Sequence, residues 1–198
     1  MALVIHNTLT GTNELFKKSK KPLKMFVCGP TVYGPAHIGH ARVEITFDTF
    51  ARYLREAGYS LFYLQNITDV DDKIINAAKD SGMSPVALAR NFEKDYVAVM
   101  KTLRVTSVDR RARASAFIKE IQEQILRLIA KGYAYETENG VYFEVRKFKE
   151  YGALSGQDLD ATRPHYRIEP DPKKKDPLDF ALWKRTDKDD GISWKSPW

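Results

Sequence analysis

Short apolar runs alternate along the chain with stretches whose apolar residues recur at every third or fourth position. The runs Met25–Cys28 and Leu61–Asn66 have the length of buried strands. Between them lies a set of apolar residues with helical spacing that stops before Gly58, namely Phe47, Phe50, Leu54 and Ala57. A strand, a helix and a strand in this order predict a right-handed parallel unit. Such a unit opens a doubly wound α/β domain, which binds its ligands at the carboxyl ends of the strands.

The middle of the chain predicts two helices. Ser84 and Pro85 are typical of a capped helix start. The buried stripe expected for this helix consists of Leu88, Phe92, Tyr96, Val99 and Leu103. The helix that follows has an apolar face and ends near Gly132, and this face consists of Ile118, Ile121, Ile125 and Leu128.

The last third of the chain predicts a β-hairpin and a polar loop. Tyr133–Thr137 and Val141–Val145 alternate around the turn Glu138-Asn139-Gly140, which is a strong hairpin signal. Residues 158–190 are polar and interrupted by proline, so we expect a mobile loop that contains one short strand, Phe180–Trp183.

Composition narrows the class of protein. A chain of 198 residues with 43% hydrophobic content can form one core, or one core with a small inserted subdomain. The formal charge of +6 favours a polyanionic partner, although an excess of this size is also typical of a solubility feature. The single cysteine excludes an internal disulfide, there is no secretory signal, and no apolar run approaches the ~20 residues that span a bilayer. We therefore expect a cytoplasmic protein with no membrane partner.

The candidate chemistry lies at Cys28–Arg42, where an apolar strand leads into a turn of small residues and then into a helix start. Free N–H groups and the positive end of a helix dipole attract phosphate at such a turn. His37 and His40 are three residues apart and share one helical face, so both rings can donate to phosphate oxygens. Gly39 between them lets a flat base or ribose approach the backbone. The spacing alone also occurs in metal sites and in ordinary surface helices.

These residues resemble the class I aminoacyl-tRNA synthetases, whose signature is His-Ile-Gly-His, and the surrounding words resemble the cysteinyl-tRNA synthetases. The similar words cover almost the whole chain: Asn7-Thr-Leu-Thr10, Cys28-Gly-Pro-Thr-Val-Tyr33, His37-Ile-Gly-His-Ala-Arg42, Phe47-Asp48, Ala51-Arg-Tyr-Leu54, Gln65-Asn-Ile-Thr-Asp-Val-Asp-Asp-Lys-Ile-Ile75, Tyr151-Gly-x-Leu-Ser155 and Asp179-Phe-x-Leu-Trp-Lys184. The resemblance implies an α/β fold with a Rossmann-like parallel sheet of the nucleotidyl-transferase type. Residues 1–132 would hold the first half of this catalytic domain with its helices. Residues 133–198 would begin the connective insertion, with its hairpin and polar loop.

The resemblance also implies an enzyme, a cysteine–tRNA ligase. The carboxylate of cysteine would attack the α-phosphorus of ATP, while Mg²⁺ and the two histidines steady the charge. The aminoacyl group would then pass to the terminal ribose of tRNA(Cys), so that catalysis is mainly positioning and electrostatics. The residues implied to bind ATP are Gly29, His37, Gly39 and His40, with His37 and His40 catalytic. Thr31 and Thr68 would lie against the bound cysteine.

Cys28 carries the implied metal site. A lone cysteine at the end of an apolar strand is usually a small buried residue, but in the similar enzymes the matching cysteine helps to hold a zinc that binds the substrate thiolate. Zinc needs at least three protein ligands, and no sequence pattern ties the other histidines, His6 and His165, to Cys28. We therefore expect an incomplete zinc site, with Cys28 a free thiol or a weak ligand.

The similar enzymes continue past the segment that corresponds to Ser196-Pro197-Trp198, and a Lys-Met-Ser-Lys-Ser loop is missing from this sequence. The chain is therefore expected to be the front part of a synthetase, with little or no aminoacylation by itself. Two polar clusters have simpler explanations than function. The carboxylates in Asn66–Lys73 are expected to cap a helix, because the Gly and distal Glu of a calcium loop are missing. We interpret the basic cluster of Arg110, Arg111 and Arg113 as the start of a solvated helix. Contact with RNA is the alternative interpretation.

Three other functions stay open. A cysteine ligase of the mycothiol-synthesis type shares Cys28 and the His-Ile-Gly-His word, but the polar insertion and the word Gln65–Ile75 favour the synthetase. A small adenylyltransferase would complete its parallel sheet within this length, and later strand–helix repeats are not evident in the sequence. A non-catalytic module that binds RNA or a nucleotide is the third alternative.

Overall fold

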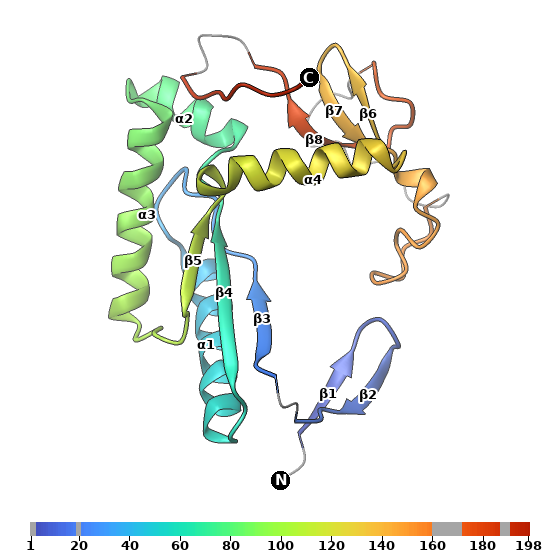
Figure 1. Cartoon of the computed structure of the whole chain (residues 1–198). Helices are drawn as coiled ribbons and strands as arrows, with labels where there is room; N and C mark the ends of the chain where they lie inside the picture. Colours follow the sequence, from blue (N-terminus) through green and yellow to red (C-terminus); the bar gives the residue numbers. More distant parts are fainter. Residues whose placement is uncertain (1–2, 19–20, 160–171, 187–190) are drawn as a thin grey trace. The chain divides into compact units, whose positions relative to one another are not determined.

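The computed structural model describes residues 3–18, 21–159, 172–186 and 191–198 (Figure 1). These residues form two compact units. The parallel unit comprises the described parts of Lys18–Ile118 and Lys188–Trp194, and the antiparallel unit those of Met1–Lys17, Lys119–Asp187 and Lys195–Trp198. The expected functional division at residue 132 stays a prediction. Much of the expected polar loop, with His165, lies outside the described residues.

A three-stranded parallel sheet with the order β3-β4-β5 organises the parallel unit. The helix α1 (Ile38–Glu56) connects β3 (Leu23–Val27) to β4 (Leu61–Ile67), and the two strands pair in parallel. The α/β fold and its opening strand–helix–strand unit are therefore confirmed. β3 ends at Val27, opposite Gln65, and β4 continues to Ile67.

The third strand, β5 (Arg110–Arg113), pairs in parallel with the end of β4, so the predicted helix start at these arginines is wrong. Strand propensity favours β-branched and aromatic residues, which is why the arginines do not indicate a strand. Two of these arginines have hydrogen-bond partners on neighbouring elements. Arg111 Nε donates to Gln65 Oε1 at 3.2 Å, and Arg113 Nε lies 2.9 and 2.8 Å from the two carboxylate oxygens of Glu93.

Three helices cover one face of this sheet: α1, α2 (Asp72–Ser81) and α3 (Pro85–Thr102). Tyr63 of β4 packs with Ala51 of α1, and Ile67 packs with apolar residues of α2 and α3. Strand residues alternate between faces, so Phe26 and Phe62 point to the other face, where they are 62% and 40% exposed. The core of the unit therefore lies between the helices and a single face of the sheet.

The buried face of α1 differs from the predicted one. Leu54 is buried as expected, but Phe47 is 36% exposed, and Glu44 and Asp48 are buried instead. These carboxylates can face the interior because each accepts hydrogen bonds there. Glu44 Oε1 accepts from Gln65 Nε2 at 2.7 Å, and Asp48 Oδ1 accepts from the backbone N–H of Ser107 at 2.6 Å.

The start of α3 is as predicted, because Ser84 Oγ accepts from the N–H of Ala87 at 3.3 Å and Pro85 is the first helical residue. Leu88 and Tyr96 are buried as predicted. Val99 and Leu103 are 42% and 39% exposed, so the predicted stripe is wrong at its carboxyl end. Ala89, Glu93 and Met100 are the buried residues that the spacing did not indicate.

The antiparallel unit contains α4 (Ile118–Ala130) and a sheet with the order β6-β7-β8. β6 (Ala134–Thr137) and β7 (Gly140–Phe143) form the predicted hairpin, and β8 (Phe180–Lys184) is the predicted short strand. Ile125, Ala134 and Val141 form its core. The unit also includes a hairpin of β1 (Val4–Asn7) and β2 (Thr12–Leu15). Two short 3-10 helices are η1 (Ala114–Phe117), in the parallel unit, and η2 (Val145–Lys147).

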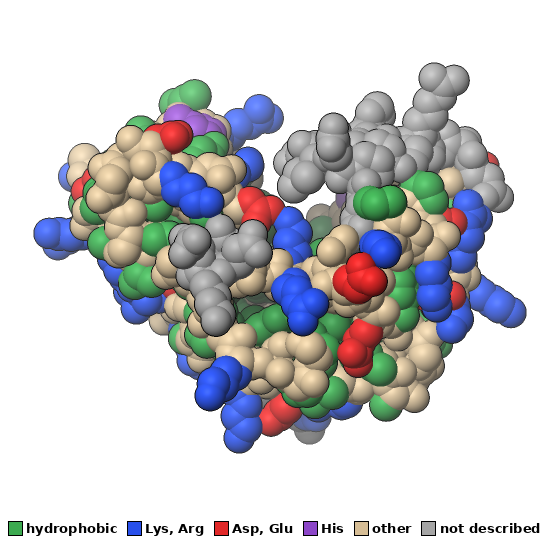
Figure 2. Space-filling model, turned by 90° about the horizontal axis from the view of Figure 1, so that it is seen from above, with side chains coloured by type: hydrophobic (Ala, Val, Ile, Leu, Met, Phe, Trp, Pro, Cys, Tyr) green, Lys and Arg blue, Asp and Glu red, His purple; other side chains and the backbone are tan. Residues whose placement is uncertain are grey.

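The surface of the described residues adds two observations. None of their helices is long and apolar enough to cross a membrane. On the face in Figure 2, described Lys and Arg side chains (blue) are interspersed with Asp and Glu side chains (red).

Candidate nucleotide-binding site

The predicted turn lies at the carboxyl ends of β3 and β4. Thr31 forms a parallel bridge with Thr68, which directly follows β4. The N–H of Thr68 donates to the carbonyl of Pro30 at 3.0 Å, and the N–H of Val32 donates to the carbonyl of Thr68 at 3.2 Å. The two threonines expected to contact the amino acid are therefore neighbours at the edge of the sheet where α/β proteins bind ligands.

Gly29 allows the chain after β3 to approach the end of β4. Its N–H donates to Asn66 Oδ1 at 2.8 Å. A Cβ atom at this position would lie only 1.8 Å from the carbonyl oxygen of Asn66. The glycine is therefore required by the approach of the two backbones, and its contact with ATP stays a prediction.

His37 and His40 cap the amino end of α1. His37 is the N-cap residue, and its Nδ1 accepts from the N–H of Gly39 at 3.1 Å. In return, Nδ1 of His40 accepts from the N–H of His37 at 3.2 Å, which completes a capping box. The ring centroids lie 3.9 Å apart. The spacing therefore brings both rings together as predicted, but the cap uses two backbone N–H groups of the turn that was expected to offer free N–H groups to phosphate.

The cap also fixes which ring nitrogen carries the proton. Because both Nδ1 atoms accept hydrogen bonds, each neutral imidazole carries its proton on Nε2. Burial, and then the neighbouring His37, lower the pKa of His40 below its ordinary 6.5, while Glu44 partly opposes them. His40 is therefore neutral at pH 7, and the Nε2–H groups are the donors that the cap does not use.

The space above Gly39 is occupied by the capping ring. A Cβ atom at Gly39 would lie 2.8 Å from Cε1 of His37. The glycine thus makes room for its own cap, and the expected approach of a base or ribose at Gly39 stays a prediction. The first turn is open to solvent, because the neighbouring Ile38 is 86% exposed.

The described residues do not form a metal centre. Among them, no three His, Cys, Asp or Glu side chains lie close enough together to hold a metal ion. Cys28 is exposed just beyond the end of β3, so the described residues offer one of the three or more ligands that zinc requires. In the acidic word after β4, Asp71 caps α2 as predicted by accepting from the N–H of Lys73 at 2.8 Å.

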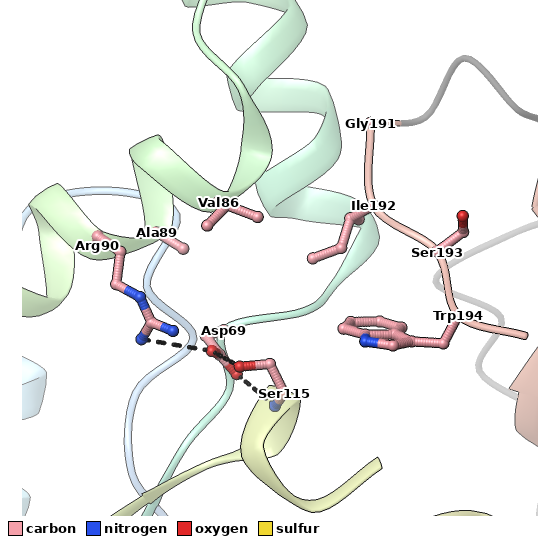
Figure 3. Close-up of a pocket in the computed structure, with 9 residues that line it drawn as sticks. All are labelled: Asp69, Val86, Ala89, Arg90, Ser115, Gly191, Ile192, Ser193 and Trp194. Carbon is pink, nitrogen blue, oxygen red and sulfur yellow. Dashed lines mark hydrogen bonds and ion pairs between the residues drawn. The ribbon is translucent and has the colours of Figure 1, made fainter.

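Asp69, next to Thr68, has a role that the capping prediction missed. Its Oδ1 accepts from the N–H of Ser115 at 2.9 Å, and its Oδ2 accepts from the Ser115 hydroxyl at 2.5 Å and lies 3.6 Å from Nη1 of Arg90. Figure 3 shows these groups on one side of a cavity of about 280 Å³, with Ile192 and Trp194 on the other. These contacts link the end of β4 to η1 and α3. Asp69 thereby serves as a polar partner of both Ser115 and Arg90.

A buried polar cluster behind His40 was also missed. Gln65 in β4 is fully buried and bonds to both Glu44 and Arg111. Two sequence signals were available. Glu44 follows His40 by one helical turn, and Gln65 interrupts an apolar strand.

Comparisons with known proteins indicate the family of the chain. The family description "tRNA synthetases class I (C) catalytic domain" matches residues 15–198. The chain is 51% identical to the cysteine–tRNA ligase of Thermoplasma volcanium, over 99% of this chain and 43% of that protein. It is 50% identical to the cysteine–tRNA ligase of Pyrococcus horikoshii, over 100% of this chain and 42% of that protein. The chain therefore spans less than half the length of these curated relatives.

A solved structure supports the fold assignment. The crystal structure of Mycobacterium tuberculosis methionyl-tRNA synthetase bound by methionyl-adenylate matches with a TM-score of 0.55 and 26% identity. The match covers 64% of this chain and 25% of that chain.

Proposed function

Because this chain belongs to the family of class I (C) tRNA synthetase catalytic domains, we propose that it supplies the nucleotide-binding part of a cysteine–tRNA ligase. Relatives of that name, about half identical over the whole chain, support cysteine and tRNA(Cys) as substrates, in preference to an amino sugar or a binding-only role. The observation that carries the proposal is the pair of capped histidines. Their remaining donors lie at the amino end of a helix, where phosphate binds.

In the proposed first step, a carboxylate oxygen of cysteine attacks the α-phosphorus of ATP and pyrophosphate leaves, which gives cysteinyl-adenylate. Negative charge builds on the phosphate oxygens in this step. Nε2–H of His37 and of His40 donate to those oxygens from rings that the capping box already orients. Most of the acceleration then comes from fixed donors that need no rearrangement.

Thr31 and Thr68 are proposed to contact the cysteine part of the adenylate. Their backbones are bridged at the edge of the sheet, and each hydroxyl can both donate and accept. In the second step the aminoacyl group passes to the terminal ribose of tRNA(Cys), and AMP leaves.

Mg²⁺ and zinc belong to the proposal only as the family resemblance implies them. Cys28 would contribute a thiolate to zinc, a soft ligand suited to that ion. The described residues do not supply the further ligands, so no step is assigned to either ion.

Binding of a stable adenylate analogue tests this function in the 198-residue chain. We expect calorimetry to detect binding of 5′-O-(cysteinyl)sulfamoyl adenosine, and we expect His37→Asn to weaken it roughly tenfold through loss of one hydrogen bond to a charged ligand. Asparagine is a good N-cap residue, so this variant keeps the start of α1 and should unfold at the wild-type temperature. Absence of binding by the wild-type chain, or equal affinity for a stably folded variant, contradicts the proposal.

A further inference from the structure

A chain of buried polar residues leads from β5 to His40. Nε of Arg111 donates to Oε1 of Gln65 at 3.2 Å, and Nε2 of Gln65 donates to Oε1 of Glu44 at 2.7 Å. Glu44 is 3% exposed and lies one helical turn after His40 on the same face of α1. The proposed reaction does not use these three residues, and a carboxylate is an expensive group to bury for packing alone.

Tyr96 of α3 packs against the same histidine. Its ring lies edge-to-face with the His40 ring, with centroids 6.1 Å apart and an interplanar angle of 82°. Tyr96 is 2% exposed, so the contact is shielded from solvent. The position of this phenol ring therefore limits the orientations open to the imidazole.

Three buried atoms in this cluster have no hydrogen-bond partner among the described residues. They are Oε2 of Glu44 and the hydroxyls of Tyr96 and Tyr63. Burial, and then the nearby Glu44, raise the pKa of Tyr96, so the phenol keeps its proton and remains a donor. Each unpaired buried donor or acceptor is costly, and Glu44 is a hydrogen-bonding neighbour of Tyr96.

The charged and titratable groups around His40 come from each surrounding element. His37 and Glu44 belong to α1, and Tyr96 belongs to α3. Tyr63 of β4 and Arg111 of β5 complete the set around Glu44. Among the described carboxylates, Glu44 is the one that raises the pKa of His40, and it acts against the burial that lowers this pKa.

We propose that Glu44 is a positioning residue for His40. Its Oε1 accepts the observed hydrogen bond from Gln65. In this proposal its Oε2 pairs with the Tyr96 hydroxyl, and so the carboxylate holds the phenol ring against the imidazole. This contact keeps Nε2–H of His40 directed at the ligand. The negative charge behind the ring also favours the polarisation of the imidazole as charge builds on the phosphate. The part of the inference that concerns phosphate rests on the proposed function.

The test compares Glu44→Gln with Glu56→Gln, a change at an exposed position of the same helix. Glutamine keeps the size of Glu44 and still accepts from Gln65, but it removes the charge. We expect the pKa of His40, followed by NMR of the imidazole nitrogens without any nucleotide, to fall in Glu44→Gln and to stay unchanged in Glu56→Gln. Affinity for the cysteinyl sulfamoyl adenosine analogue is expected to fall several-fold in Glu44→Gln alone.

Tyr96→Phe tests the route from Glu44 to His40, because it keeps the ring and removes the donor. We expect it to weaken analogue binding by itself. The double variant should bind no more weakly than Glu44→Gln alone, since both changes break one contact. Additive effects, or an unchanged pKa of His40 in Glu44→Gln, would overturn the inference. If Glu44→Gln does not fold, unchanged analogue binding by Tyr96→Phe overturns the inference.

The two proposals can fail separately. If the wild-type chain binds no analogue, the proposed function fails, whereas the NMR titration still decides the role of Glu44.

Discussion

Gly29 shows how much a single missing side chain determines at the edge of the site. The backbone carbonyl oxygen of Asn66 lies where a Cβ at position 29 would be. The side-chain oxygen Oδ1 of the same asparagine accepts from the glycine N–H. The close approach brings the chain after β3 against the end of β4, just before the bridge between Thr31 and Thr68. The residue therefore acts on the site through backbone geometry.

Replacement of Gly29 by alanine is expected to lower the free energy of unfolding by about 3 kcal/mol or more, because a backbone carbonyl cannot move away as a side chain can. Gly34→Ala is the matched control. A Cβ at Gly34 meets nothing within 4 Å, so its effect should stay within about 0.5 kcal/mol. Urea unfolding of both variants measures the difference. Equal stability of the two would show that β3 and β4 do not approach each other in this way.

In the proposed function, the two histidines each have two roles. Each ring holds the start of α1 through Nδ1 and leaves Nε2–H for a ligand. An alanine substitution therefore mixes loss of a helix cap with loss of a donor. An asparagine at position 37 separates the two effects, because it replaces only the cap.

At the scale of elements, Asp48 connects α1 to the loop between α3 and β5. It is 5% exposed, and its Oδ1 accepts from the N–H groups of Thr106 and Ser107 at 2.8 and 2.6 Å. Arg52 Nε donates to the other carboxylate oxygen at 2.6 Å. Burial by itself raises the pKa of Asp48, but the hydrogen bonds from Arg52, Ser107 and Thr106 outweigh it, and the pKa lies below its ordinary 3.8.

Asp48→Asn is expected to cost about 2 kcal/mol at pH 7, because it weakens hydrogen bonds to a buried charge and turns an amide toward Arg52. The stabilisation by ionised Asp48 is complete above the unfolded pKa of about 3.9 and is lost as the pH falls through the lower folded value. The stability difference between wild type and variant should therefore shrink below about pH 4. Chemical unfolding at several pH values measures it, with the exposed Asp95→Asn as control. A difference that is constant with pH would contradict this role for Asp48.

The elements with a strong local pattern were predictable from the sequence. They include β3, β4, the hairpin of β6 and β7, and the capped start of α3. β5 was not predictable, because its arginines are stabilised by Gln65 and Glu93, which are distant in the sequence. The same cause explains the wrong face of α1. Glu44 and Asp48 are buried by partners that no local spacing indicates.

For the whole molecule, the sequence predicted where a phosphate site would lie, and the structure adds the contacts around the two histidines. Apolar strands, a turn and two histidines at helical spacing were enough to indicate a phosphate site at Cys28–Arg42. The capping box, the neutral tautomer of His40 and the polar cluster behind it depend on three-dimensional contacts. The family relationship supports the proposed reaction, and the chain spans 42–43% of the length of the relatives compared.

A crystal structure of the 198-residue chain with the cysteinyl sulfamoyl adenosine analogue tests the proposed nucleotide site. We predict that the sulfamoyl group, which stands in for the α-phosphate, lies over the amino end of α1. Its oxygens should lie within about 3.2 Å of Nε2 of both His37 and His40. The cysteinyl part should lie beside Thr31 and Thr68. An analogue bound elsewhere on the chain, or histidine rings that turn Nδ1 toward the ligand and break the capping box, would contradict the account.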